Sequence, residues 1–232
     1  MQPRVLVGCP TSFHKEYALQ QYARAVKSLT YKNHDILLVD NSQGDDYFEK
    51  IKKLEIPTIK GPYFESARER IIASRNILRQ KVIDEDYDYF FSLEQDILPP
   101  QDILEKLLQH KKEVITAIYF ANNIIPGEVS SKLIPLAYIL EDEKTLSMRP
   151  LNEDELWKNQ SLMKIVSAGL GCVLIHRNVL KKIKFRYELN TFDDRWFFLD
   201  LYHKGISAHA DTSIKCNHLI YNRPYPWSKI KK

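Results

Sequence analysis

The chain is poor in the residues that mark disulfide-rich, linker-rich or low-complexity proteins. It has three cysteines, seven glycines and 11 prolines among 232 residues. The cysteines (Cys9, Cys172 and Cys216) each sit in or beside an apolar run, without CxxC spacing. We therefore expect buried, reduced thiols in a reducing compartment, not disulfides. Glycine and proline are too sparse for a flexible linker or a low-complexity tract.

Long hydrophobic runs are also missing. No apolar run approaches the length of about 20 residues that a membrane-spanning helix requires. The N-terminal MQPRVLVGCP enters an apolar run at once and reaches a proline too soon for a signal peptide. We therefore expect a soluble, cytoplasmic protein. The net charge of +4 is small and the lysines are scattered, so we expect no nucleic-acid partner, whereas an anionic substrate is compatible.

Hydrophobic residues make up 44% of the chain and charged residues 28%, a globular balance that predicts one large domain. Apolar runs alternate with segments of helical periodicity, which predicts a mostly parallel twisted sheet with helices on both faces. The pattern loosens after Ala121 and becomes regular again at GCVLIHR. We expect strands at 4–11, 35–42, 56–61, 87–93, 113–120, 134–140, 171–177 and 206–211. We expect helices at 15–29, 45–54, 65–82, 102–108, 178–183 and 192–205, and a short helix or loop at 152–158. The helix at 192–205 is apolar on two faces, so we expect it to be buried on most sides.

Polar residues follow the predicted strands at their carboxyl ends, where ligands collect in open parallel sheets. The first strand ends in Pro10 and Thr11, the second in Asp40 and Asn41, and the fourth in Glu94-Gln95-Asp96. No GxGxxG follows the first strand, which argues against a dinucleotide site, and a P-loop is also absent.

Glu94 and Asp96 make a short acidic clamp at a strand end. Magnesium typically takes one or two protein carboxylates and completes its shell with water and substrate phosphates. The clamp therefore fits a cation that holds a nucleotide diphosphate. A simpler interpretation is that Asp96 caps the turn before Pro99.

The order of several short motifs resembles that of GT-A fold glycosyltransferases, most like family 2. These motifs span Arg4 to His218: VGCPT, LLVDNS, ASRN, SLEQDI, SAGLGCVLIHR, FDDRWFF and CNH. The resemblance implies a GT-A (Rossmann-like) α/β fold in a single domain over 1–232. Within it we expect a nucleotide-binding half at about 1–120, an acceptor and catalytic half at about 121–218, and a basic aromatic tail at 219–232.

The resemblance also implies roles for individual residues. Asp194 would be the general base, with Asp193 as the alternative, and Asp96 and His218 would hold Mn²⁺ or Mg²⁺. Glu94-Gln95-Asp96 stands where the family has its DxD motif, although the first acid here is Glu. The substrate-binding residues would be Pro10, Thr11, Asp40, Asn41, Arg75, Glu94, Gln95, Gly169 and Gly171. Among them, Thr11 and Asp40 would hold the nucleoside base, and Arg75 and Glu94 would lie near the nucleotide and its ribose. The two glycines of SAGLG would let the backbone approach the sugar closely.

Each of these roles has a structural alternative. Arg75 could be a solvated charge or a salt-bridge partner on its helix, and His218 an ordinary buried histidine. One of Asp193 and Asp194 could be the N-cap of the helix that follows. Three further histidines are expected at the surface: His14, His34 and His110.

The predicted activity is metal-dependent, inverting transfer of a sugar from a nucleotide-diphosphate sugar to a hydroxyl of a glycan, lipid or protein acceptor. One alternative is a nucleotidyltransferase that makes a nucleotide sugar, but such enzymes carry a glycine-rich loop, and GCPTSFHKEY has one glycine. The other alternative is a non-catalytic nucleotide- or carbohydrate-binding module. The lysines and tryptophan of the tail would also suit weak contact with an anionic membrane surface.

Overall fold

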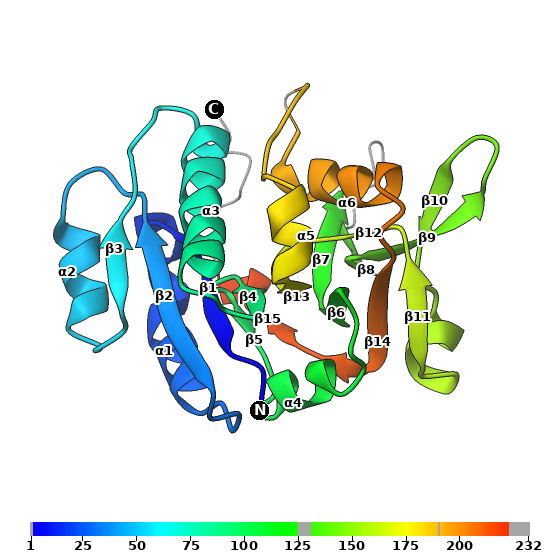
Figure 1. Cartoon of the computed structure of the whole chain (residues 1–232), viewed down its shortest axis with the longest axis horizontal. Coiled ribbons are helices and arrows are strands. Elements are labelled where there is room, and N and C mark those ends of the chain that lie inside the picture. Colours follow the sequence, from blue (N-terminus) through cyan, green and yellow to red (C-terminus); the bar gives the residue numbers. More distant parts are fainter. Residues whose placement is uncertain (1, 125–130, 190, 223–232) are drawn as a thin grey trace.

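The fold is built on one mixed sheet of eight strands, in the order β11-β14-β6-β13-β4-β1-β2-β3 (Figure 1). The computed structural model describes residues 2–124, 131–189 and 191–222. Four neighbouring strands of the first half run parallel, as alternating strands and helices predict. They are β1 (Val5–Thr11), β2 (His34–Asp40), β3 (Thr58–Lys60) and β4 (Tyr89–Leu93).

The second half adds strands of both directions. β13 (Cys172–His176) runs antiparallel between β4 and β6 (Val114–Ile118). β14 (Ala208–Lys215) is parallel to β6, and β11 (Leu162–Ile165) pairs antiparallel with β14 at the edge. The mostly parallel sheet is confirmed, with β13 and β11 as antiparallel members. The chain enters β13 from the edge at which β4 ends, so β13 must run in the opposite direction.

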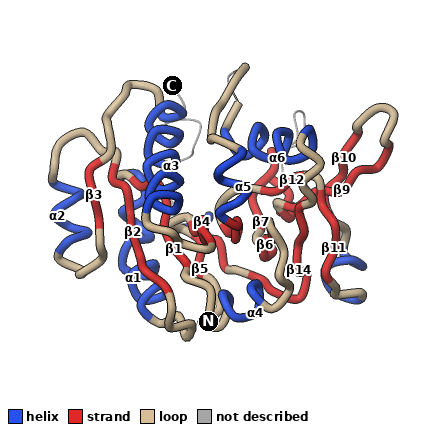
Figure 2. Tube along the Cα trace, viewed as in Figure 1, coloured by secondary structure: helices blue, strands red, loops and turns tan. Residues whose placement is uncertain are grey.

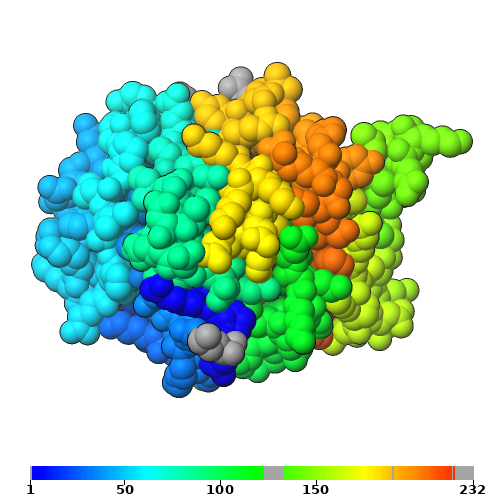
Figure 3. All heavy atoms as spheres, in the orientation of Figure 1, coloured from blue at the N-terminus to red at the C-terminus, as the bar shows by residue number. Residues whose placement is uncertain are grey.

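The irregular stretch after Ala121 forms small accessory sheets. The hairpin of β9 (Ala137–Asp142) and β10 (Ser147–Pro150) pairs with β12 (Ser167–Ala168) and projects from the body of the molecule (Figure 3). β7 (Phe120–Ile124) pairs with β8 (Ser131–Pro135), and β5 (Ile97–Leu98) with β15 (Asn217–His218). The strands expected at 113–120 and 134–140 are each interrupted. The breaks lie at Tyr119 and Leu136, and one backbone hydrogen bond joins them: Leu136 N donates to Tyr119 O at 3.0 Å.

Helices cover both faces of the sheet (Figure 2). The helix expected at 15–29 is divided into a 3₁₀ segment, η1 (Phe13–Ala18), and α1 (Leu19–Lys27). Asp102 holds the N-cap position of α4, but its carboxylate pairs with Lys106 at 2.9 Å instead of capping. The remaining helices are α2 (Asp46–Lys52), α3 (Ala67–Asp84), α4 (Ile103–Leu108), η2 (Asp154–Lys158), α5 (Arg177–Lys182), α6 (Asp193–His203) and η3 (Ile220–Asn222).

In the described ranges, no helix combines the length and apolar character needed to cross a bilayer. Of the predicted tail, Leu219 and Ile220 are buried. Residues 223–232 of the tail, which include the segment proposed for membrane contact, lie outside the described residues. All three cysteines are buried free thiols, as expected.

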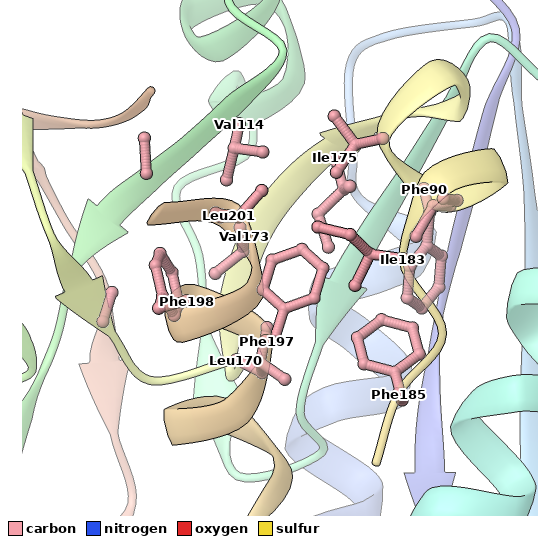
Figure 4. Packing of buried hydrophobic residues seen from close by; sticks show 14 of the residues in the cluster. Phe90, Val114, Leu170, Val173, Ile175, Ile183, Phe185, Phe197, Phe198 and Leu201 are labelled. Atoms are coloured by element: carbon pink, nitrogen blue, oxygen red, sulfur yellow. The ribbon is translucent and has the colours of Figure 1, made fainter. Parts of the chain in front are cut away.

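The core is divided between the two faces of the sheet. On one face α3 packs over β1, β2 and β4 and α5 over β13, and α6 supplies the aromatic centre (Figure 4). The rings of Phe197 and Phe185 stack with their centroids 5.2 Å apart. The other face is covered by α1, α2 and α4. The apolar helix expected at 192–205 is thus a core helix, although its end at Tyr202 and His203 is exposed.

Replacing Phe197 with alanine tests this packing. The side chain is 1% exposed, so its removal should leave a cavity and lower the free energy of unfolding by about 3–5 kcal/mol. Tyr202→Ala, on the same helix but 48% exposed, should change stability by no more than about 0.5 kcal/mol. Urea denaturation measures both variants, and equal losses would contradict the assignment of Phe197 to the core.

Candidate active site

A cavity of about 270 Å³ opens where β1, β2 and β4 end, and it collects most of the predicted site residues. The predicted residues that line it are Pro10, Thr11, Asn41, Arg75, Glu94, Gly169, Asp193, Asp194 and His218. The other four predicted residues (Asp40, Gln95, Asp96 and Gly171) do not line the cavity. The lining residues that the sequence interpretation missed include Ser12, His14, Lys15, Arg70, Tyr119 and Phe192. His14, expected at the surface, thus belongs to the cavity wall.

Arg75 is the centre of a buried ionic network. Its Nε donates to Asp193 Oδ2 at 2.6 Å and its Nη1 to Ser92 Oγ at 2.7 Å. Its Nη2 lies 3.5 Å from Glu94 Oε1. Arg75 therefore ties α3 to the first turn of α6 and to the end of β4. Arg75 is therefore a salt-bridge partner, as one interpretation of the sequence predicted, and it also lines the cavity.

Asp193 and Asp194 are neighbours in the chain but differ in environment. Phe192 occupies the N-cap position of α6, so neither carboxylate is the cap. Asp193 is buried and bound to Arg75. Asp194 is half-buried, and its Oδ1 accepts a hydrogen bond from Arg195 N at 2.7 Å. Burial and the adjacent charge of Asp193 raise the pKa of Asp194 to about 6, which suits a group that accepts a proton near neutral pH.

Gln95 and Asp40 support the cavity from behind its wall. The Gln95 amide donates to Tyr47 Oη at 2.6 Å and to Lys15 O at 3.0 Å, and its oxygen accepts from the Thr11 hydroxyl. Gln95 therefore orients Thr11 and does not itself line the cavity.

Asp40 is fully buried, so its predicted contact with a nucleoside base would be indirect. Its Oδ1 accepts from Ser42 N at 3.0 Å and its Oδ2 from Lys60 Nζ at 2.9 Å. Its neighbour Asn41 lines the cavity instead.

The glycines of SAGLG pack closely against Tyr119 and Ile97. A Cβ atom on Gly169 would overlap the Tyr119 hydroxyl, and one on Gly171 would overlap Ile97. Gly171 N donates to Tyr119 Oη at 3.0 Å. Of the two glycines predicted to approach a sugar, Gly169 lines the cavity and Gly171 packs behind it.

The two predicted metal ligands lie close together. His218 Nε2 is 3.4 Å from Asp96 Oδ2, a gap that one ion bonded at about 2.1 Å to each atom can span. His218 Nδ1 lies 2.7 Å from Phe120 O, the second contact that orients a ligating imidazole. Among the described residues no group of three or more His, Cys, Asp or Glu side chains could hold a metal ion. The pair fits a divalent cation only where water and substrate phosphates complete the shell.

Asp96 also carries contacts that the sequence interpretation missed. Lys15 Nζ lies 2.6 Å from its Oδ1 and Tyr17 Oη donates to its Oδ2 at 2.7 Å. Both residues lie in η1, directly after the carboxyl end of β1. Lys15 could have been predicted as a site residue from this position, because ligands bind at the carboxyl ends of the strands in such sheets. Tyr119 carried no comparable signal.

Solved structures support the fold, whereas the sequence comparisons found no similar protein. No family model matches the chain, and no curated protein matches it in sequence. Among solved structures, GalNAc-T7 with UDP, GalNAc and Mn²⁺ aligns over 93% of this chain and 44% of its own, with TM-score 0.66 and 12% identity. Mannosyltransferase PcManGT from Pyrobaculum calidifontis, in complex with GDP-Man and Mn²⁺, aligns over 100% and 61%, with TM-score 0.65 and 13% identity.

A third solved structure, A197 from STIV, aligns over 94% of this chain and 87% of its own, with TM-score 0.51 and 16% identity. The chain thus spans most of A197 but less than two thirds of GalNAc-T7 and PcManGT. These likenesses confirm the α/β fold of GT-A glycosyltransferases that the motif order implied.

Removing the Arg75 charge tests the buried network. Arg75→Met leaves Asp193 buried without its partner, so the free energy of unfolding should fall by about 3–5 kcal/mol. Lys27→Met breaks an exposed pair with Glu55 and should cost about 1 kcal/mol or less. Urea denaturation of both variants is the measurement. A loss for Arg75→Met as small as that for Lys27→Met would show that the pair contributes no more than a surface contact.

Proposed function

We propose that the protein is a glycosyltransferase that moves a sugar from a nucleotide-diphosphate sugar to an acceptor hydroxyl. The observation that carries the proposal is Asp194, a half-buried carboxylate with a pKa of about 6, in a cavity at the carboxyl ends of β1, β2 and β4. The similar structures of GalNAc-T7 and PcManGT are described with UDP and with GDP-Man, which supports a nucleotide-sugar donor.

In the proposed reaction Asp194 takes the proton of the acceptor hydroxyl as that oxygen attacks the anomeric carbon. The new carbon–oxygen bond forms while the bond to the diphosphate breaks, and the nucleoside diphosphate leaves. A single displacement of this kind inverts the configuration at the anomeric carbon. Asp193 is less suited to the role, because its Oδ2 is bound to Arg75.

The nucleotide would lie at the other end of the cavity. Pro10, Thr11 and Asn41 line it there, where β1 and β2 end, and we assign them to the nucleoside. We assign Glu94 to the ribose, as the resemblance implies. Arg75 would act mainly by holding Asp193 and Glu94 in place.

Asp96 and His218 are the residues that would hold Mn²⁺ or Mg²⁺, with water and diphosphate oxygens as the other ligands. Such an ion supplies positive charge that stabilises the departing diphosphate. The similar structures of GalNAc-T7 and PcManGT are both complexes with Mn²⁺, which supports this part of the proposal. We also predict that the transferred sugar is a hexose. The acceptor is predicted to be a glycan, a lipid or a protein.

The substrate class is tested by incubating the protein with UDP- and GDP-sugars and Mn²⁺ and measuring release of nucleoside diphosphate, with and without added sugar acceptors. Hydrolysis or transfer with at least one donor is expected. Failure with every nucleotide sugar would contradict the proposal. Pyrophosphate release from a sugar phosphate and a nucleoside triphosphate would instead identify a nucleotidyltransferase.

The pH dependence tests Asp194. A general base must be deprotonated, so kcat/KM should rise with pH through about 6 and then level off. Asp194→Asn should lower kcat by about 10²–10⁴-fold. Asp200→Asn, farther along the same helix and paired with Arg186, is the control and should keep the wild-type rate and pH profile. Full activity of Asp194→Asn would remove Asp194 from the mechanism.

A further inference from the structure

Lys15 bridges the two carboxylates of the acidic clamp. Its Nζ lies 2.6 Å from Asp96 Oδ1 and 3.6 Å from Glu94 Oε2. The Lys15 side chain is 15% exposed and that of Asp96 is fully buried. Lys15 also lines the cavity, so a short movement would bring its ammonium from the clamp to a ligand there.

A buried carboxylate is stable only with a compensating positive charge and hydrogen bonds. In this structure the Lys15 ammonium supplies charge to Asp96, and Tyr17 and His218 also contact its carboxylate. A divalent cation on the same carboxylate would supply that charge instead. Because like charges repel, the ammonium and the cation compete for Asp96.

We propose that Lys15 and the divalent cation exchange at Asp96, and that the displaced ammonium of Lys15 binds the diphosphate of the donor. This inference rests on the proposed function and adds a donor-binding residue to it. A lysine suits the exchange, because its charge sits on a flexible four-carbon stem. Arg75, also in the cavity wall, is held by Asp193 and Ser92, and its movement would leave the buried Asp193 carboxylate unpaired.

The exchange has a direct readout in the wild-type protein. Lysines are labelled with an amine-reactive reagent and quantified by mass spectrometry, first in EDTA, then with Mn²⁺, then with Mn²⁺ plus UDP or GDP. Labelling of Lys15 should increase with Mn²⁺ and decrease again when the diphosphate is added. Lys50, which pairs with Glu16 at the surface, is the internal control and should not change. Labelling of Lys15 that is unaffected by Mn²⁺ would overturn the inference.

A variant measures the competition as an affinity. Lys15→Met keeps most of the apolar stem and removes the charge, so the dissociation constant for Mn²⁺ without nucleotide should fall by about tenfold or more. Lys50→Met, with the same charge change in an exposed pair, should bind Mn²⁺ as the wild type does. Manganese electron paramagnetic resonance counts the free ion. Mn²⁺ should also raise the melting temperature more in Lys15→Met than in wild type. An unchanged or weaker affinity in Lys15→Met contradicts the exchange.

The outcomes separate this inference from the proposed function. If UDP or GDP binds with Mn²⁺ but Lys15 does not respond to the metal, the exchange is wrong and the proposed function stands. If Mn²⁺ releases Lys15 but no nucleoside diphosphate or nucleotide sugar binds, the competition at Asp96 is real. In that case the proposed function, and with it the role of Lys15 toward a diphosphate, is wrong.

Discussion

The candidate site depends on the buried ion pair between Arg75 and Asp193. It joins α3, from the first half of the chain, to α6 in the second, and its third contact reaches Glu94 at the end of β4. Because an unpaired buried charge is costly, the pair also fixes the first turn of α6, which carries Asp194. Ser92 holds the same guanidinium and bonds Leu170 O at 2.6 Å, so the SAGLG segment joins the network as well.

Much of this arrangement could be predicted from the sequence, because its signals are local. Apolar runs that end in polar residues marked β1, β2 and β4, and the shared direction of parallel strands brought Thr11, Asn41 and Glu94 to one edge. The apolar periodicity of FDDRWFFLDLY predicted a core helix with acids in its first turn, as in α6. Asp96 and His218, 122 positions apart, were paired only through the family resemblance, and they do lie side by side.

The rest could not be predicted, because it depends on contacts between distant residues. Nothing local shows that Asp40 is bound by Lys60, or that Gln95 points inward to Thr11 and Tyr47. A backbone hydrogen bond from Leu136 to Tyr119 joins the break between β6 and β7 to the break between β8 and β9. Neither break could therefore be predicted from the residues of its own segment. The glycines of SAGLG were assigned to a sugar, whereas the space beside Gly169 is taken by Tyr119 and that beside Gly171 by Ile97 and Tyr119.

The charges around the cavity explain why adjacent aspartates can have different tasks. Two neighbouring carboxylates cannot both stay ionised at low cost, so the charge of one raises the pKa of the other. Burial raises the pKa of Asp193, and the bound Arg75 opposes that rise. The charge of Asp193, added to burial, raises the pKa of Asp194 to about 6. Lys15 plays the corresponding part at the other end, where it compensates Asp96 beside Glu94. In each acidic pair, one carboxylate is thus bound by a cation. At Asp193 that cation is the rigidly held guanidinium of Arg75, and at Asp96 it is the ammonium of Lys15 on its flexible stem.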